Sequence, residues 1–202
     1  MPDEENRMTE ETFLVAQDVY LKAGVHIGTK HKTKYMSKFI YKTRPDGLSV
    51  LNLQEIDARI RVAASFLAHY SPEEILVVSR RENGWKAVKA FGKYTDIRVF
   101  AGRYPPGILT NPSLRNYTEA KIMLVTDAWP DKNAVSDAKA VGIPVIALCD
   151  TNNSANDIDL VVPCNNKGKK SLGLFFYILA KEYLRLRGAP EQEFNQEEFT
   201  PE

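Results

Sequence analysis

Apolar residues occur along this chain in short continuous runs that alternate with longer amphipathic segments. Runs rich in Val, Ile and Leu predict strands at residues 74–79, 97–100, 121–127, 144–150 and 160–163. The segments between and after them predict helices at residues 83–94, 130–142 and 169–187. Continuous apolar strands separated by helices of about ten to fifteen residues are typical of a parallel sheet covered on both faces. The pattern therefore predicts a doubly wound α/β domain.

A helix, a hairpin and a second helix precede this alternation. Residues 12–24 place apolar side chains at helical spacing, and Gly24 is suited to end that helix. Residues 38–53 read as two short strands around the turn Arg44-Pro45-Asp46-Gly47, in which Pro fixes φ and Gly permits a positive φ. Asn52 predicts the N-cap of the next helix, with Glu55 completing a capping-box pattern. Its predicted buried face comprises Leu53, Ile56, Ile60, Ala63, Ala64 and Leu67.

The composition of the two ends differs from that of the middle. Residues 1–11 hold few apolar groups and many acids, so we expect a disordered acidic N-terminus. Residues 12–188 form the predicted single domain, including the N-terminal helix and the hairpin, and residues 189–202 form an acidic C-terminal tail. The net charge of +1 hides this segregation, because the body without both ends has a charge near +10. A basic body predicts a polyanionic partner, although charge alone fits a soluble domain with charged ends equally well.

Several function classes are excluded by what the sequence lacks. No run of eighteen or more apolar residues occurs, so no membrane span is expected. The acidic N-terminus lacks the basic start and apolar centre of a secretory signal. Cys149 and Cys164 do not form a CxxC pair, which argues against zinc and fits a reducing cytosol. We therefore expect a cytoplasmic protein without a metal.

The stretch "GVHIGTKHKTKYMSKF" is strongly basic, and no Asp or Glu occurs between Asp18 and Asp46. His26 and His31 lack further metal ligands nearby, and the surrounding lysines would repel a cation, so a metal site is excluded. A polar loop and an RNA-binding segment remain. We call residues 30–44 the basic arm; its candidate RNA-binding residues are Lys30, His31, Lys32, Lys34, Tyr35, Lys38, Lys42 and Arg44. Lysines supply charge to phosphates, and the interleaved rings can stack on bases.

The arm also shows a strand-like alternation. Phe39 and Tyr41 alternate with Lys38 and Lys42, which predicts one packed face and one solvated face. That arrangement keeps the lysines exposed and is compatible with RNA binding.

The carboxyl ends of the predicted strands offer a second candidate site, since small ligands bind there in doubly wound sheets. These ends contain Asp, Asn and Arg, but none of the three histidines, so a nucleophile paired with a base is missing. A protein that binds a sugar phosphate or nucleotide at this edge is the alternative function. Arg103 lies in the long loop over residues 101–116, which is suited to line a substrate pocket or to contact a large partner.

The segment "NNKGKKS" after the last strand resembles a phosphate loop only superficially. Pro163 stands where the first glycine of GxxxxGK[ST] belongs, and Lys170 replaces the Ser or Thr. What remains is Lys167, Lys169 and Lys170 at the start of a helix, which favours either an anion such as a nucleic-acid phosphate or simple solvation.

Taken in order, the motifs "AGVHIGTKHKTKYMSKFIY", "GLSVLNL", "GRYPPGILTNP" and the segment from "LVTDAWPD" to "LAKEYL" resemble the ribosomal protein S-two family of the small subunit, in its archaeal and eukaryotic form. The resemblance covers most of residues 14–187. The long coiled-coil insertion of bacterial members is absent, because one ordinary helix stands between "GLSVLNL" and "EILVVS".

The resemblance implies a flavodoxin-like parallel sheet of five strands and a structural, non-enzymatic role in the small ribosomal subunit. It implies binding to small-subunit rRNA and to neighbouring ribosomal proteins, with no cofactor, small-molecule substrate or membrane. The family's basic N-terminal region maps onto Lys30 to Arg44. With Arg103, Lys167, Lys169 and Lys170, these residues are the expected rRNA contacts. We expect the acidic ends to shield the basic surface before assembly.

Overall fold

Five strands form one parallel sheet in the computed structural model, which describes residues 13–189 and 195–200. The strands are β3 (Ile75–Ser79), β4 (Arg98–Ala101), β5 (Ile122–Val125), β6 (Val145–Cys149) and β7 (Leu160–Pro163). Their spatial order is β4-β3-β5-β6-β7. Counted by appearance within this sheet, the order is 2-1-3-4-5, which is the flavodoxin-like order. The predicted doubly wound α/β fold is confirmed.

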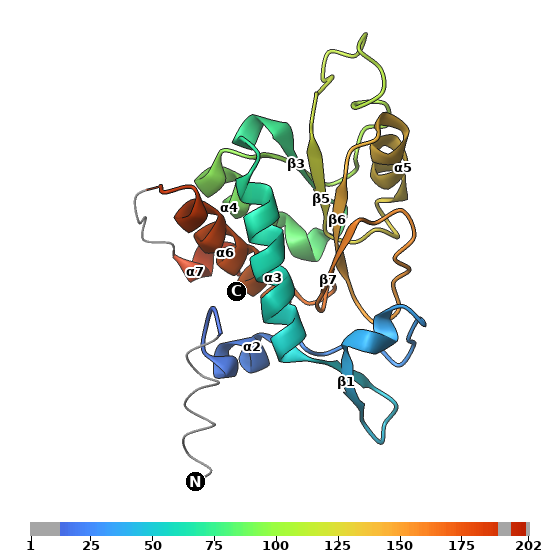
Figure 1. The fold of residues 1–202 in the computed structure, drawn as a ribbon, viewed down its shortest axis with the longest axis vertical. Helices are drawn as coiled ribbons and strands as arrows, with labels where there is room; N and C mark the ends of the chain where they lie inside the picture. The colour runs from blue at the N-terminus through green and yellow to red at the C-terminus, as the bar shows by residue number, and fades with distance from the viewer. Residues whose placement is uncertain (1–12, 190–194, 201–202) are drawn as a thin grey trace.

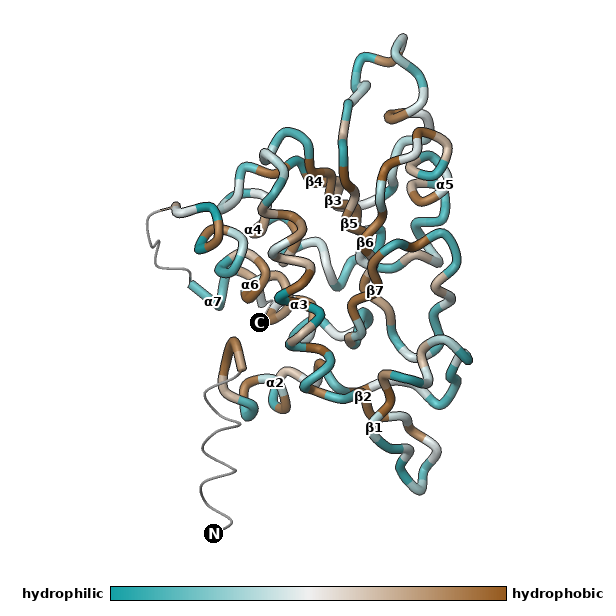
Figure 2. Tube along the Cα trace, viewed as in Figure 1, coloured by the Kyte–Doolittle hydropathy of each residue, from teal (hydrophilic) through white to brown (hydrophobic). Residues whose placement is uncertain are grey.

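The strands read as continuous apolar runs because both faces of the sheet are covered. All residues of β3, β5 and β6 are buried. Helices α3 (Leu53–Ala68), α4 (Glu82–Thr95) and α6 (Lys169–Leu186) lie on one side of the sheet, and α5 (Lys132–Val141) lies on the other (Figure 1). Figure 2 shows the hydrophobic residues concentrated in the strands and on the inner sides of these helices.

Helix α3 has the start that the sequence predicts, and its buried face is as predicted except for Leu53, which is half-buried. The Asn52 Oδ1 accepts a hydrogen bond from the Gln54 amide at 3.1 Å, so Asn52 is the N-cap. The fully buried stripe comprises Ile56, Ile60, Ala63, Ala64 and Leu67.

A loop over residues 102–121 replaces a helix between β4 and β5, and it packs against α5. The Asp137 carboxylate of α5 accepts hydrogen bonds from the Tyr104 hydroxyl at 3.1 Å and from the Gly107 amide at 2.8 Å. Burial and the neighbouring carboxylate raise the pKa of Tyr104, so its hydroxyl stays protonated and can donate. Ile108 and Leu109 are also buried, and the predicted long loop is therefore partly a packing element.

Helix α2 (Gln17–Ala23) begins later than the apolar spacing over residues 12–24 predicts. The reason is Asp57, a buried carboxylate on α3. Its Oδ1 accepts hydrogen bonds from the Leu14 amide at 2.9 Å and the Tyr20 hydroxyl at 2.8 Å. This tertiary contact holds residues 13–15 against α3 in a non-helical conformation. The predicted end is confirmed, because Gly24 adopts a φ of +69° and caps the helix.

The hairpin consists of β1 (Ile40–Thr43) and β2 (Ser49–Leu51), which pair antiparallel. Its turn is as predicted, with Gly47 at a φ of +83°. The predicted alternation is wrong: Phe39 is buried, but Tyr41 is 70% exposed. Residues Met36–Phe39 form a 3₁₀ turn, η1, and a bulge interrupts the register between Ile40 and Lys42, so the period of two is lost.

Part of the predicted acidic tail packs on the domain. Residues Gln196–Phe199 form a short helix, α7, against α4 and α6 (Figure 1). The Phe199 ring is fully buried and stacks on Tyr94 with a centroid distance of 5.6 Å. On α4, the Lys86 ammonium donates to the Glu197 and Thr200 carbonyls at 3.1 and 2.8 Å. The tail segment thus covers part of the basic surface of α4.

Gly173 on α6 makes room for α7, and this predicts a selective way to release it. A Cβ at Gly173 would lie 2.8 Å from both the Phe199 carbonyl oxygen and the Thr200 hydroxyl. The Gly173→Ala variant should therefore displace α7, while α6 gains up to about 1 kcal/mol of intrinsic helix propensity. Hydrogen exchange should become fast at residues 195–200 and stay unchanged in α6. A chain truncated after residue 189, which lacks α7, is the control for exchange in α6. Continued protection of residues 195–200 in Gly173→Ala would contradict the packing described.

Candidate nucleic-acid interface

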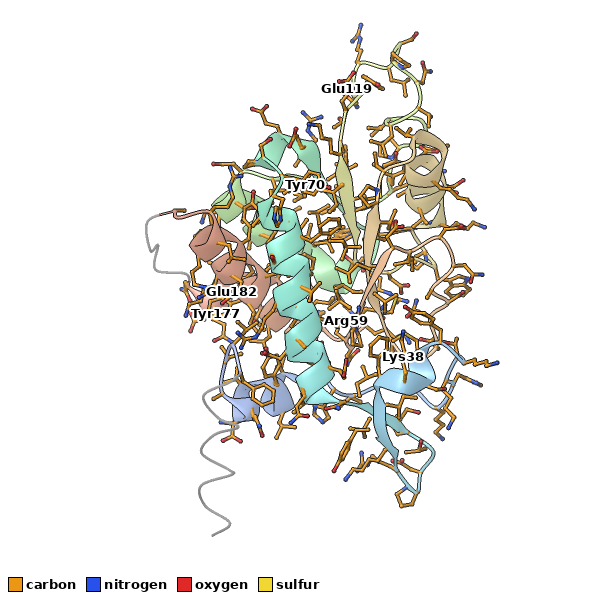
Figure 3. The ribbon with its side chains drawn as sticks, viewed as in Figure 1. Lys38, Arg59, Tyr70, Glu119, Tyr177 and Glu182 are labelled. Atoms are coloured by element: carbon orange, nitrogen blue, oxygen red, sulfur yellow. The ribbon has the colours of Figure 1, made fainter. Side chains whose placement is uncertain are left out.

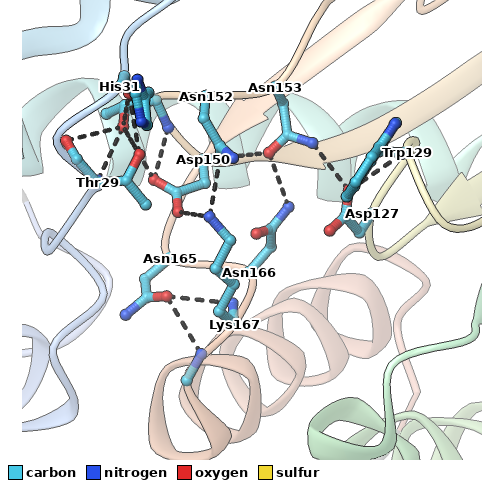
Figure 4. Close-up of polar contacts among 12 residues, drawn as sticks. Thr29, His31, Asp127, Trp129, Asp150, Asn152, Asn153, Asn165, Asn166 and Lys167 are labelled. Atoms are coloured by element: carbon cyan, nitrogen blue, oxygen red, sulfur yellow. Dashed lines mark hydrogen bonds and ion pairs between the residues drawn. The ribbon is translucent and has the colours of Figure 1, made fainter.

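The carboxyl ends of β5, β6 and β7 form a buried polar network, which we call the strand-end rim. It consists of Asp127, Asp150, Thr151, Asn153 and Asn166, all of which are buried. Asn153 lies at its centre. The Asn153 amide group donates to Asp127 at 2.8 Å, and its Oδ1 accepts from the Asp150 amide at 2.9 Å and the Asn166 side chain at 3.2 Å (Figure 4). Three strand ends are thereby joined through one side chain.

Two cations neutralise the carboxylates of the strand-end rim. The Arg81 Nε donates to Asp127 Oδ2 at 2.6 Å, and the Lys167 ammonium contacts Asp150 Oδ2 at 2.7 Å. Arg81 follows β3 and Asp127 follows β5. Their ion pair therefore lies at the topological switch point of the sheet, where the strand order reverses. That point is where doubly wound folds hold small ligands. The acids that an enzyme could use there are therefore engaged in the protein's own contacts.

Asp131, the N-cap residue of α5, is the exception among these acids. Its Oδ2 accepts from the Arg80 amide at 3.1 Å, but its buried Oδ1 has no partner among the described residues. Burial raises the pKa of Asp131 to about 6.

The raised pKa of Asp131 predicts a pH-dependent penalty. A carboxyl with a higher pKa in the folded state than in the unfolded state destabilises the fold when it ionises. The penalty grows as the pH rises from about 4 and is complete above about 6, reaching at most about 3 kcal/mol. The Asp131→Asn variant should therefore be more stable than the wild type at pH 7 by up to that amount. Urea unfolding at pH 4 and pH 7 tests this, and a difference that does not depend on pH would contradict it.

The start of the basic arm is fastened to the strand-end rim by hydrogen bonds. The Thr151 Oγ1 accepts from the Thr29 amide at 2.9 Å and lies 3.0 Å from the His31 carbonyl, to which it can donate. The Thr33 amide donates to the Thr151 carbonyl at 2.9 Å, and the Thr33 hydroxyl donates to the Asn153 carbonyl at 3.0 Å. The sequence separates the arm from the strand ends by about 120 positions, but the structure joins them.

Gly28 lies where the segment before the basic arm passes close to Thr151 of the strand-end rim. Its amide donates to the Ser49 carbonyl at 2.9 Å, and a Cβ there would lie 2.5 Å from Thr151 Cγ2. Gly28 is buried, so only a residue without a side chain fits at this place.

The cations of the basic arm point away from the rim into solvent. Lys30, Lys32, Lys34, Lys38 and Lys42 are all exposed. Within residues 13–189 and 195–200, none of these five lysines lies within ion-pair distance of a carboxylate. Only Arg44 has an acidic neighbour, the exposed Asp46 at 4.0 Å. The arm therefore presents positive charge that no carboxylate of the described residues neutralises.

Two cations are positioned by aromatic rings at the 3₁₀ turn of the arm. The Lys38 ammonium lies 4.0 Å from the centre of the Tyr35 ring, and the Arg59 guanidinium lies 5.4 Å from that of Phe39. Lys38 comes from the arm and Arg59 from α3 (Figure 3). Arg59 was not among the residues selected from the sequence, because only the tertiary fold places α3 beside the arm.

The histidines differ from one another in position. The His31 side chain is exposed on the arm, and His69 is exposed at the end of α3. His26 is half-buried, and burial lowers its pKa below the ordinary value, so its ring is neutral at pH 7. His26 therefore adds no positive charge to the arm at pH 7.

The remaining predicted RNA-binding residues lie at three different places in the structure. Lys169 and Lys170 are exposed in the first turn of α6, which follows β7. Arg103 is exposed after β4, four strand positions from β7 and so roughly 20 Å across the sheet. Lys167 is bonded to Asp150 and to the Asn152 side chain, which gives it a role within the protein. Lys169 and Lys170 thus follow β7 at one end of the strand order, and Arg103 follows β4 at the other end.

No group of three His, Cys, Asp or Glu residues suited to a metal ion occurs in the part of the chain that the structure describes. Among the same residues, no helix is both long and apolar enough to cross a membrane.

Comparison with known proteins gives a consistent assignment. The family described as "Ribosomal protein S2" matches residues 20–121 and 114–185. The chain is 51% identical over 175 residues to the "Small ribosomal subunit protein uS2" of Nanoarchaeum equitans, covering 87% of each chain. It is 45% identical over 194 residues to the protein of the same name from Methanococcus maripaludis, covering 95% of this chain and 88% of the relative. For the relative from Thermofilum pendens the identity is 46% over 185 residues, covering 92% and 86%.

The matches span both the basic arm and the strand-end rim, and the identities are high over nearly the whole chain. The chain belongs to the ribosomal protein S2 family.

Proposed function

We propose that this protein is a structural constituent of the small ribosomal subunit that binds small-subunit rRNA mainly through its basic arm. The single observation that carries the proposal is the set of five exposed lysines on an arm whose base is fixed by hydrogen bonds. Unneutralised lysines gain most from phosphates, because each contact releases condensed counterions from the RNA. The names of its relatives, which are small-subunit proteins, support the same role.

The proposed rRNA face comprises Lys30, His31, Lys32, Lys34, Tyr35, Lys38, Lys42 and Arg44, together with Lys169 and Lys170. The exposed Tyr35 ring supplies a surface for stacking, and Arg59 adds a cation beside Phe39. Arg103 is a separate contact at the other end of the edge. Lys167 supports the face indirectly, because its ion pair with Asp150 fixes the rim on which the arm is held.

Fixing the base of the arm before binding favours affinity. A free loop would lose conformational entropy on binding, about 1–2 kcal/mol for each residue that becomes ordered. The hydrogen bonds of Thr29, Thr33 and Thr151 reduce that loss in advance. Other doubly wound proteins bind ligands at this edge of the sheet. Here the edge holds an RNA-binding segment in place.

Other small-subunit proteins are the remaining proposed partners, and the ribosome in the cytoplasm is the proposed location. The alternative, binding of a sugar phosphate or nucleotide at the strand ends, is disfavoured by the contacts within the rim. The Arg81–Asp127 and Lys167–Asp150 pairs and the Thr29–Thr151 contact engage polar groups that such a ligand would otherwise use.

Binding to small-subunit rRNA over a range of salt concentrations tests the proposal. Log affinity should fall linearly with log salt, with a slope of about −0.7 to −0.9 for each phosphate contacted. Transfer RNA at equal mass is the control for non-specific binding. A slope near zero, or equal affinity for both RNAs, would contradict the proposed function.

A further inference from the structure

Trp129 is an exposed aromatic residue outside the face described above. Its side chain is 80% exposed, the highest value among the large hydrophobic residues in the described part of the chain. Tryptophan carries a large apolar ring with a polar edge and is enriched where proteins contact partners. The residue lies just after β5, at the place where the order of the sheet reverses.

The backbone under Trp129 is rigidly held. The Trp129 amide donates to Asp127 Oδ1 at 3.1 Å, and the same oxygen accepts from Asn153 at 2.8 Å (Figure 4). Asp127 is itself buried and paired with Arg81. A ring that is exposed on a fixed base is presented to a partner at little further loss of conformational entropy.

Two cations flank the ring. Arg80 is exposed, and its guanidinium donates to the Pro130 carbonyl at 3.2 Å, next to Trp129. Lys132 is exposed in the first turn of α5. Neither forms an ion pair with a described carboxylate, whereas Asp127 and Asp157 beside them are paired with Arg81 and Lys139. The buried Asp131 adds one negative charge beside Arg80. The two cations outweigh it, so the charge that remains here is positive.

The ring borders a hollow of about 550 Å³. Amide and hydroxyl side chains line it, including Ser136, Asn152, Ser154 and Asn156. Such groups can donate to and accept from the edges of a base.

We propose that Trp129 is a stacking platform for an unpaired base of rRNA, with Arg80 and Lys132 contacting the adjacent phosphates. This inference rests on the proposed function and adds a second contact to the same edge of the sheet. Asn153 links the two contacts, because it bonds to Asp127 under Trp129 and to Thr33 of the basic arm. An RNA strand that follows this edge can reach both.

Fluorescence gives a direct test, because the chain has only two tryptophans. In the Trp85→Phe variant, all tryptophan emission comes from Trp129. Titration with small-subunit rRNA at constant salt should quench most of this emission, since a base stacks on the indole. The Trp129→Phe variant, which retains Trp85, is the matched control and should show little quenching.

Affinity gives the second readout. Trp129→Ala should weaken binding by about fivefold to a hundredfold, as stacking contacts do, with the salt slope unchanged because no charge is lost. Trp129→Phe should retain most of the affinity. If Trp129→Ala binds like the wild type, or Trp129 emission is not quenched, the inference is overturned while arm-dependent RNA binding stands. Quenching only after other ribosomal proteins are added would also overturn it, and loss of all RNA binding in the wild type would reject the proposed function itself.

Discussion

Replacing Lys30, Lys32, Lys34 and Lys38 together with alanine should reduce the salt slope of rRNA binding by about 3. Each lysine that neutralises one phosphate contributes about 0.7–0.9 to the slope. If wild type and variant bind equally at 1 M salt, a slope difference of 3 makes the variant about a thousandfold weaker at 0.1 M. The measurement is filter binding or fluorescence anisotropy with labelled rRNA at several salt concentrations.

A charge-matched control separates the arm from the general basicity of the protein. Lys22, Lys89, Lys121 and Lys181 are exposed on α2, α4, the segment before β5 and α6. Among the described residues, Lys121 alone of these four has an ion-pair partner, Glu74, and an exposed pair of this kind contributes little to stability. Their replacement by alanine removes the same charge and should change the slope by less than about 1. Equal slopes for the two variants would place the RNA face elsewhere.

Gly28→Ala should weaken rRNA binding without changing any charge. The new Cβ would lie 2.5 Å from Thr151 Cγ2 and 3.0 Å from the Ser49 carbonyl oxygen. Such overpacking costs about 1–3 kcal/mol and should release the start of the arm from the rim. Ordering the released residues on RNA then costs about 1–2 kcal/mol each. We expect a tenfold to hundredfold loss of affinity, roughly 1.4–2.8 kcal/mol, with the salt slope retained.

The structure supplies a rescue for this variant. Serine at position 151 keeps the hydroxyl that bonds to Thr29 and His31 but lacks the Cγ2 that meets the new Cβ. Gly28→Ala combined with Thr151→Ser should therefore recover part of the affinity, because the new Cβ still lies 3.0 Å from the hydroxyl of residue 151 and from the Ser49 carbonyl oxygen. Thr151→Ser alone should behave like the wild type. Absence of any rescue would show that contact with Thr151 Cγ2 is not what weakens binding in Gly28→Ala.

The four-lysine variant and Gly28→Ala separate charge from preorganisation. The lysine variant changes the slope, whereas Gly28→Ala changes the affinity at constant slope. This distinction follows from the structure, because the lysines point to solvent and Gly28 lies beneath them against the rim.

The sheet and its helices were predictable because buried parallel strands leave an unmistakable local pattern. The strands β3, β5 and β6 are mainly apolar and buried throughout. Asn52 and Gly24 cap their helices through contacts with residues close to them in the chain. Local sequence also indicated which cations of the arm are exposed.

Contacts between distant segments could not be predicted in the same way. The start of α2 depends on Asp57, which lies about 40 positions further on and bonds to Leu14. Tyr41 is exposed because a bulge follows Ile40, and the spacing of residues does not reveal bulges. The position of α7 depends on Gly173 and Tyr94, which lie on two other helices.

The candidate site shows the same division. The composition of the arm identified its lysines, but nothing local in "GTKHKTKY" or "CDTNNS" shows that Thr29 and Thr151 meet. Lys167 looked like a cation available to RNA, and its partner Asp150 lies 17 residues earlier on another strand. Arg103 and the arm lie on one edge but far apart, which only the strand order reveals.

Co-sedimentation with small ribosomal subunits that lack this protein tests the central claim most directly. The wild type, at physiological salt, should move with the subunit. The four-lysine arm variant should remain largely at the top of the gradient, and the control with Lys22, Lys89, Lys121 and Lys181 replaced should move with the subunit. Wild-type protein at the top of the gradient, or an arm variant that sediments as fully as the wild type, would contradict the account.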